Sequence, residues 1–151
     1  MNQTLQKNDP NYKRPESVLV VVYTLQGDVL MLRRTQPRWF WQSVTGSLGW
    51  GESPRRAAAR EVFEETGLKV EGNLIDAHRG RRFPIVRPWR ERYAPDTRMN
   101  HEHWFFLPLG TQRSIRLNPR EHEEFRWFSL QQAARRVSSW TNRDAILLLI
   151  R

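Results

Sequence analysis

The chain has no cysteine among its 151 residues. This absence excludes disulfides, thiol catalysis and zinc–thiolate sites, and it is compatible with a reducing compartment. Long apolar runs are also missing. Residues 145–150 are apolar but too few to cross a membrane, so they predict the end of a packed helix. The polar first dozen residues lack the apolar centre of a signal peptide. We therefore expect a cytoplasmic protein without a membrane partner.

Internal repeats and low-complexity stretches are absent too, and the length is that of one ordinary domain. Seven tryptophans, seven phenylalanines and many aliphatic residues are enough for a sizeable core. We expect residues 1–12 to form a loose N-terminal arm. Residues 13–151 are expected to form a single domain, and no sequence feature specifies an oligomeric state.

Acidic residues are outnumbered, with 16 Asp and Glu against 25 Lys and Arg and a net charge of +9. This balance predicts anionic partners, although the preference for arginine could equally reflect the base composition of a genome. The most basic segment, residues 78–92, could line an entrance for a small polyphosphate. Its interleaved aromatic residues could instead bind RNA, which is the less favoured interpretation.

Apolar and β-branched residues predict a first strand at residues 17–25 and a second at 29–33, joined by a hairpin turn. Ser129 is expected to cap a helix through Val137, and Thr141 or Asn142 to cap a last helix that ends near Ile150. Further strands are expected at residues 40–45, 74–78, 102–107 and 125–128. The pattern predicts an α/β fold with a mixed sheet flanked by helices.

The most informative segment is residues 46–68, GSLGWGESPRRAAAREVFEETGL. Its glycines favour a flexible or left-handed loop, and Ser53 followed by Pro54 is typical of a helix start. The helix is predicted to end at Thr66, because Gly67 supplies a left-handed stop.

Three glutamates of this helix fall on one face, together with Ala57, at helical spacing. The opposite face is expected to pack against the core: Ala59, Val62, Phe63 and Thr66. Carboxylates three and four residues apart repel one another unless cations lie nearby. Magnesium is the expected cation because it prefers oxygen ligands and phosphates. The alternative is a solvated face that pairs with arginines: Arg55, Arg56 and Arg60.

The same segment resembles the box of the Nudix hydrolase family, G-x5-E-x7-R-E-U-x-E-E-x-G-U with U apolar, at every fixed position. The matching residues are Gly46, Glu52, Arg60, Glu61, Val62, Glu64, Glu65, Gly67 and Leu68. The resemblance implies an α/β/α sandwich and a diphosphatase that uses Mg²⁺, with Mn²⁺ as a possible substitute. A non-catalytic copy of the fold is the alternative.

The resemblance also implies roles for individual residues. Glu61, Glu65 and then Glu64 are the expected metal ligands, Arg60 is expected to orient a carboxylate, and Glu52 to lie just outside the ligands. A further ligand is expected six residues before a tryptophan, at Glu121. Its competitors are Glu123 and Glu124. A water deprotonated with help from Glu61 or Glu121 would attack an in-chain phosphorus without a covalent intermediate.

Four shorter segments are similar to the branch of that family that converts dihydroneopterin triphosphate to the monophosphate and pyrophosphate in folate biosynthesis. They are YKRP at 12–15, FWQSVTGS at 40–47, RYAP at 92–95 and SWTNR at 139–143. The similarity implies substrate contacts from Lys13, Arg34, Thr45, Phe83, Pro84, Ile85, Val86 and Ser139, with Asn142 as a further candidate. Residues 48–51 depart from the more acidic loop of that branch, and the segment between Gly67 and Phe83 is a few residues shorter.

Two alternative functions remain. The first is another Nudix pyrophosphohydrolase, acting on nucleoside triphosphates such as 8-oxo-dGTP or dATP, on dinucleoside polyphosphates or on RNA 5′ ends. The second is a binding module without catalysis.

His101 and His103 share one side of a predicted strand. Because the sequence offers no third ligand at zinc spacing, we interpret both as structural.

Overall fold

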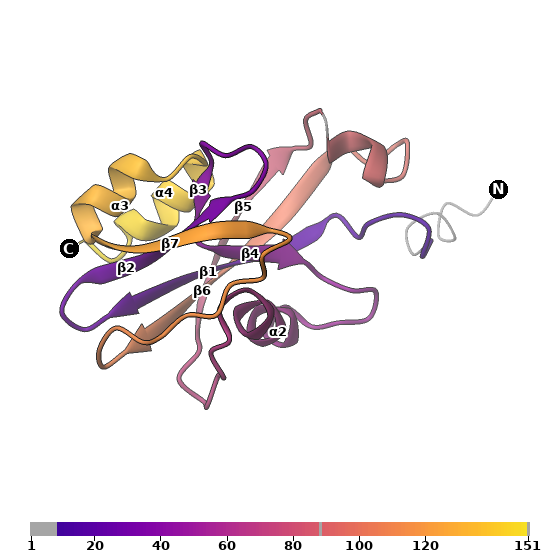
Figure 1. Ribbon diagram of the computed structural model, residues 1–151. Coiled ribbons are helices and arrows are strands. Elements are labelled where there is room, and N and C mark those ends of the chain that lie inside the picture. Colours follow the sequence, from indigo (N-terminus) through magenta and orange to yellow (C-terminus); the bar gives the residue numbers. More distant parts are fainter. Residues whose placement is uncertain (1–8, 88, 151) are drawn as a thin grey trace.

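A mixed β-sheet with helices on both faces forms the centre of the computed structural model (Figure 1), which describes residues 9–87 and 89–150. The strands are β1 (Glu16–Thr24), β2 (Asp28–Arg34), β3 (Trp41–Gln42), β4 (Val44–Ser47), β5 (Ile75–Pro84), β6 (Met99–Leu109) and β7 (His122–Ser129). The main order is β3-β2-β1-β6-β5, while β4 pairs with β1 and β7 with β2. β1 pairs in parallel with β6 over the whole length of β1, from Glu16 opposite His101 to Thr24 opposite Leu109.

Alternate residues of the sheet face two separate parts of the core, as the two-residue period of a strand requires. On one face, Val18, Val20 and Phe105 pack against helix α2 (Pro54–Thr66). On the other face, Leu19 and Trp104 pack with the helices α3 (Leu130–Arg136) and α4 (Trp140–Leu147). Figure 1 shows α2 on one side of the sheet and α3 and α4 on the other. The predicted sandwich is confirmed.

The ends of α2 are those that the sequence predicts. Ser53 Oγ accepts a hydrogen bond from the Arg56 N–H at 3.2 Å, and Gly67 has a left-handed φ of 77°. The predicted division of its faces is confirmed for Val62 and Thr66, which are buried, and is wrong for Phe63, which is 44% exposed instead of packed. The glutamates Glu61 and Glu65 are buried beside Ala57, whereas the Glu64 side chain is exposed. Only part of the acidic face therefore points into the protein.

Strand boundaries differ from the predictions in two places. The strand expected at residues 40–45 is broken at Ser43, because the Ser43 N–H donates to Asn142 Oδ1 at 2.8 Å instead of to a neighbouring strand. β5 extends to Pro84 and β6 starts at Met99, well beyond the predicted bounds. They pair with each other through a polar stretch at the edge of the sheet, where apolar periodicity is weak.

The last helix starts two residues earlier than a cap at Thr141 would allow, and three earlier than a cap at Asn142. Ser139 is the N-cap, with its hydroxyl accepting from the Asn142 N–H at 3.4 Å, and α4 ends at Leu147. Thr141 and Asn142 lie buried in the first turn, where their side chains serve contacts other than capping. The predicted cap at Ser129 is confirmed, with Gln132 completing a capping box.

The expected N-terminal arm lies mostly outside the described residues. Residues 9–12 form a turn, and the Tyr12 carbonyl accepts a hydrogen bond from Trp50 Nε1 at 3.0 Å. The division at residue 12 stays a prediction. Among the described helices, none is long and apolar enough to cross a membrane.

Candidate active site

A cavity of about 800 Å³ lies between α2 and the edge formed by β5 and β6. Its acidic side contains Glu61, Glu65 and Glu121. Its aromatic side contains Phe83, Trp89 and Trp140, and polar side chains also line the cavity. All four segments that resemble one Nudix branch contribute to its lining. The contributed residues include Lys13, Phe40, Gln42, Thr45, Gly46, Ser47, Arg92, Tyr93 and Ser139. Segments far apart in the sequence thus converge on one cavity.

The backbone of β4 gives the acidic side its shape. A Cβ atom added to Gly46 would overlap the Glu61 carboxyl group, so only glycine leaves room for that side chain. The next residue toward the N-terminus, Thr45, donates its N–H to Glu65 Oε2 at 3.4 Å. The glycine loop and the helix therefore position the two buried carboxylates together.

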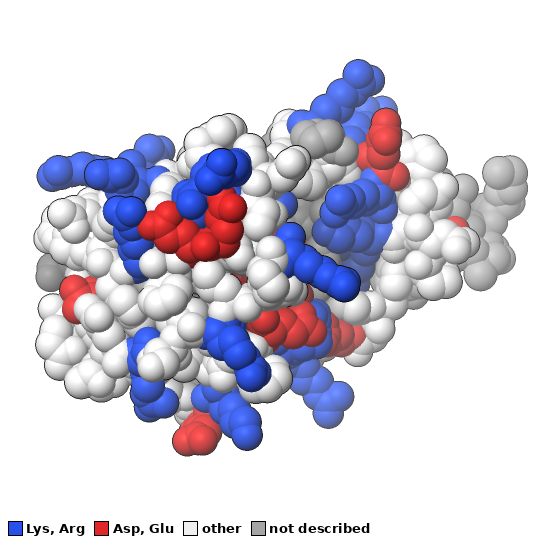
Figure 2. Space-filling view, viewed as in Figure 1, with Lys and Arg blue, Asp and Glu red and all other residues white. Residues whose placement is uncertain are grey.

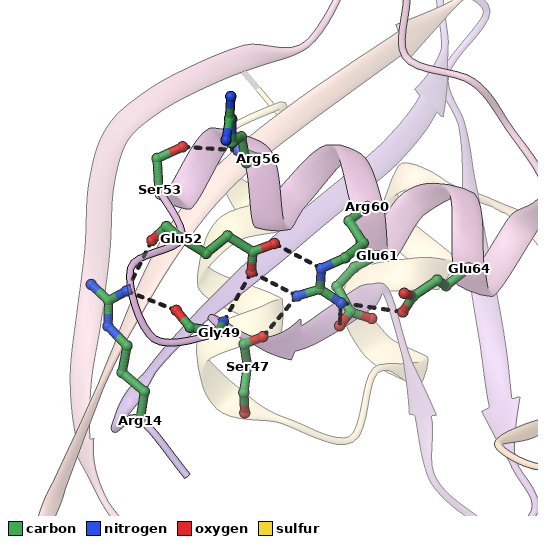
Figure 3. A network of polar contacts seen from close by, with 9 residues as sticks. All are labelled: Arg14, Ser47, Gly49, Glu52, Ser53, Arg56, Arg60, Glu61 and Glu64. Atoms are coloured by element: carbon green, nitrogen blue, oxygen red, sulfur yellow. Dashed lines mark hydrogen bonds and ion pairs between the residues drawn. The ribbon is translucent and has the colours of Figure 1, made fainter. Parts of the chain in front are cut away.

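Arg60 connects the loop to the helix, as Figure 3 shows. Its guanidinium holds Glu52 in a bidentate ion pair with both contacts at 2.8 Å, and it bonds Glu61 at 2.8 Å and Glu64 at 3.2 Å. These bonds to Arg60 lower the pKa of Glu52 to about 2. Glu52 thus contacts Arg60, which in turn contacts Glu61, and the supporting role predicted for Glu52 stays a prediction.

Arg14 fixes the other end of the same loop (Figure 3). It donates to the carbonyls of Gly49 and Glu52 at 3.0 and 2.9 Å and pairs with Glu16 at 2.9 Å. Trp50, in the segment that departs from the resembling branch, anchors the loop to Tyr12 as described above. The less acidic loop is therefore held by hydrogen bonds of its own.

The buried carboxylates carry more negative charge than the protein around them neutralises. Burial raises the pKa of Glu61 to about 7, against the opposing effect of Arg60. Burial, followed by Glu61 and Glu121, raises the pKa of Glu65 well above its usual value. A divalent cation would offset this cost, and the oxygen donors suit a hard metal ion. The residues present fit such an ion.

Glu121 lies with this group, while its two competitors do not. Ligand atoms of Glu65, Glu121 and His122 all lie within 4.8 Å of one another. Glu123 instead pairs with Arg33 at 2.6 Å and with Arg38, and Glu124 also pairs with Arg33. Figure 2 shows a red acidic surface next to blue basic side chains over β7, separate from the red surface over α2. The geometry favours Glu121.

The alternative interpretation of this helix is a solvated face on which glutamates pair with arginines, and it applies to Glu64 only. That side chain is exposed, bonds Arg60 and is not part of the cavity lining. Arg55 donates to the Leu74 carbonyl at 2.8 Å and does not pair with these glutamates. The acidic cluster is thus split between two buried carboxylates and one exposed carboxylate.

All eight predicted substrate-contact residues line the cavity. Burial, followed by the charge of Arg92, lowers the pKa of Lys13, against the opposing effects of Glu61 and Glu121. The Thr45 hydroxyl donates to the Val18 carbonyl at 2.9 Å, and the Thr45 N–H donates to Glu65. Both hydrogen-bond donors of Thr45 are therefore already bonded within the protein. The amide of Asn142 is likewise held by Ser43.

Sequence reasoning missed several polar residues of the lining, notably His122, Asn100 and Glu102. His122 Nδ1 is buried with no hydrogen-bond partner in the described part of the chain, and burial, then Arg34, lower its pKa to about 4. A charged or polar residue inside an apolar strand, as in HEHWFFL, is the signal that could have identified Glu102.

The structure places a third candidate ligand beside His101 and His103. Glu16 Oε2 lies 2.9 Å from His103 Nε2, and the ligand atoms of the three residues lie within 4.8 Å of one another. However, Arg14 pairs with the same carboxylate, and Arg82 is close enough to His101 to help lower its pKa after burial and His103. The structural interpretation of both histidines stays a prediction.

Comparison with known proteins agrees with this geometry. The NUDIX domain pattern matches residues 13–149. Dihydroneopterin triphosphate diphosphatase of Escherichia coli strain K12 is 44% identical over 142 residues, covering 91% of this chain and 93% of that protein. The Haemophilus influenzae protein of the same name is 38% identical and covers 89% of this chain and 87% of its own length. A solved structure of the E. coli dihydroneopterin triphosphate pyrophosphohydrolase superposes with a TM-score of 0.84 at 43% identity, covering 92% of this chain and 97% of that one.

Proposed function

The chain belongs to the Nudix family, and we propose that it hydrolyses dihydroneopterin triphosphate to dihydroneopterin monophosphate and pyrophosphate in folate biosynthesis. The observation that carries this proposal is similarity to enzymes of that name along nearly the whole length of both chains. The cavity supports it, because the same pocket combines a carboxylate cluster for phosphates with an aromatic side for a ring.

Magnesium is the proposed cofactor, with manganese as a substitute. Glu61, Glu65 and Glu121 would hold it, with Glu64 beside them on α2. Such an ion, when bound, neutralises charge on the phosphates and makes water a better nucleophile. Two basic residues of the lining, Lys13 and Arg34, are placed to contact the phosphates.

The protein's own groups would handle the proton and the geometry of attack. Glu61 or Glu121 accepts the proton of the attacking water. Arg60, bonded to both Glu52 and Glu61, keeps the first of these carboxylates in place. The ring would lie against Phe83, Pro84, Ile85 and Val86, with Ser139 at its rim.

A substrate comparison tests the proposal. Purified protein is given dihydroneopterin triphosphate, dATP, 8-oxo-dGTP, a dinucleoside tetraphosphate and a 5′-triphosphorylated RNA at equal concentrations with Mg²⁺. We expect the highest kcat/KM for the pterin compound, with pyrophosphate as a product. Preference for a nucleotide would replace the proposed substrate, and inactivity on all five compounds with Mg²⁺ and Mn²⁺ would favour a binding module.

RNA ends stay the second candidate because several exposed arginines of the basic segment lie outside the cavity lining. Arg79, Arg82 and Arg87 are exposed and do not line the pocket. The RNA arm of the comparison decides whether they form a binding surface. The cytoplasmic location also stays a prediction, which cell fractionation would test.

The identity of the base needs a separate experiment. Glu61→Gln and Glu121→Gln are compared for turnover at saturating Mg²⁺ and for the Mg²⁺ concentration that gives half-maximal rate. Loss of the base lowers turnover more than metal affinity, whereas loss of a ligand shifts the metal requirement. Equal losses in both variants would contradict the assignment of one base.

A further inference from the structure

Two buried polar side chains on the aromatic side of the cavity have no part in the chemistry proposed above. Asn100 and Glu102 come from β6, two residues apart, so they lie on the same face of the sheet. They are 3% and 5% exposed, respectively, and both line the cavity. Amides and carboxylates are seldom buried without a full set of partners, so their placement needs an explanation.

Both residues line the cavity and retain unused acceptor capacity. Trp104 Nε1 donates to Glu102 Oε1 at 2.9 Å, and the Thr141 hydroxyl is a second donor, while a carboxylate offers about four acceptor positions. Asn100 Nδ2 donates to Ser17 Oγ at 2.8 Å, and its Oδ1 is buried with no partner among the described residues. This part of the wall therefore offers acceptors to a ligand.

No basic side chain of the described chain forms an ion pair with Glu102. The nearest candidate on the neighbouring strand, Arg81, lies over the Trp104 ring at 4.6 Å and pairs with Asp144 at 3.6 Å. Burial accordingly raises the pKa of Glu102, against the bonds from Trp104 and Thr141. Ligand N–H groups would meet a carboxylate that the protein leaves without a cation.

We propose that Glu102 and Asn100 select the substrate by accepting hydrogen bonds from two adjacent N–H groups of a 2-amino-4-oxopyrimidine ring. This inference rests on the proposed function and names the residues that recognise its substrate. Pterins carry those donors at N3 and the 2-amino group, and guanine carries the equivalent pair. Adenine presents an acceptor nitrogen at the same edge, which leaves a buried carboxylate without its donor, and such sites discriminate strongly.

The test measures kcat/KM of the wild type, Glu102→Gln and the control Glu71→Gln for dihydroneopterin triphosphate, dGTP and dATP. Glu71 is exposed and outside the cavity, so its variant changes the same charge without changing the site. For Glu102→Gln we expect a loss of about tenfold to a hundredfold on the pterin and guanine compounds, mostly through KM. Activity on dATP should stay the same or rise.

The ratio between substrates decides the outcome. If Glu102→Gln keeps the wild-type ratio of dihydroneopterin triphosphate or dGTP to dATP, the recognition proposal is overturned. An equal loss on all three substrates, with a lowered melting temperature, would make Glu102 a structural residue and overturn it too. Failure of the wild type on the pterin compound would contradict only the proposed function, and the dGTP to dATP ratio would still decide the recognition.

A measurement without a variant covers the case in which Glu102→Gln does not fold. Dihydroneopterin and deoxyguanosine, which lack phosphates, are compared with deoxyadenosine as inhibitors of the wild-type enzyme. The first two should inhibit at concentrations about tenfold lower. Equal inhibition by all three compounds would contradict recognition of the N–H edge.

Discussion

The acidic and aromatic sides of the cavity are built in different ways. Most of the acidic side comes from one continuous segment, residues 46–65, in which Arg60 bonds three glutamates. The aromatic side combines residues from β1, β5, β6 and α4. The first and the last of these elements lie more than a hundred positions apart in the sequence. A short motif can therefore specify the chemistry, whereas recognition of the ring depends on the tertiary fold.

The two sides of the cavity also differ in charge. Burial raises the pKa values of Glu61 and Glu65, so the acidic side is incomplete without a cation. The aromatic side has apolar walls and one buried carboxylate, Glu102. Changes on the acidic side should affect every substrate equally, and changes on the aromatic side should affect substrates according to their ring.

The largest effect is expected from Glu65→Gln. Removing this buried ligand should lower kcat/KM by about 1,000-fold, roughly 4 kcal/mol of transition-state stabilisation, on pterin and nucleotide substrates alike. The metal-free variant should melt at the same or a higher temperature, because a buried charge has been removed. Steady-state kinetics and thermal unfolding in EDTA provide the measurements. A loss confined to one substrate would contradict the claim that the acidic side affects every substrate equally.

Gly46→Ala should have the next largest effect. The added methyl group would overlap the Glu61 carboxyl group and displace it, and misplacement by about 1 Å can lower rates about a hundredfold. Gly110→Ala is the matched control, since a Cβ there meets open space. Nearly unchanged turnover in Gly46→Ala would show that the close approach is unimportant.

Arg60→Lys should cost about tenfold to a hundredfold in activity or metal affinity, because lysine cannot form the bidentate pair with Glu52. The loss should appear as a higher Mg²⁺ requirement for all substrates. Arg56→Lys on the same helix, whose side chain has no polar contact among those of the described residues, serves as the control. An unaltered Mg²⁺ titration in Arg60→Lys would remove Arg60 from the positioning of Glu61.

The sequence predicts those parts of the fold and site that depend on local interactions. Ser53, Pro54 and Gly67 determine the ends of α2 through caps and backbone preference, and the structure agrees. Prediction from the sequence fails where the burial of a side chain depends on residues that are distant in the chain. Glu61 and Glu65 lie on the polar face of a helical wheel, which suggests exposure to solvent, yet both are buried where α2 packs beside β4 and lines the cavity. Phe63, which the sequence predicts to pack, is exposed instead.

The same reasoning explains the missed residues of the aromatic side. Glu102 lies two residues before Trp104 in β6, so its place in the strand hints at burial, but the cavity beside it is formed by residues from other parts of the chain. Ser139, Thr141 and Asn142 are all suitable caps by residue type, and only the extended backbone at Ser139 decides among them. Local propensity cannot choose between residues that tertiary contacts assign to different roles.

The smallest effect is expected from Ser139→Ala. Loss of this N-cap should lower the free energy of unfolding by about 1 kcal/mol and the melting temperature by about 2–4 °C. A modest rise in KM for the pterin compound should accompany it, because Ser139 lines the cavity. Ser129→Ala removes a cap outside the cavity lining and should match the melting temperature without the KM change. Equal kinetics in both variants would limit Ser139 to its structural role.

The most direct measurement is magnesium-dependent hydrolysis of dihydroneopterin triphosphate by the wild-type protein, set beside dATP and 8-oxo-dGTP at equal concentrations. We predict pyrophosphate and dihydroneopterin monophosphate as the products, with the highest kcat/KM for the pterin compound. A higher kcat/KM for either nucleotide, or release of orthophosphate in place of pyrophosphate, would contradict the proposed function.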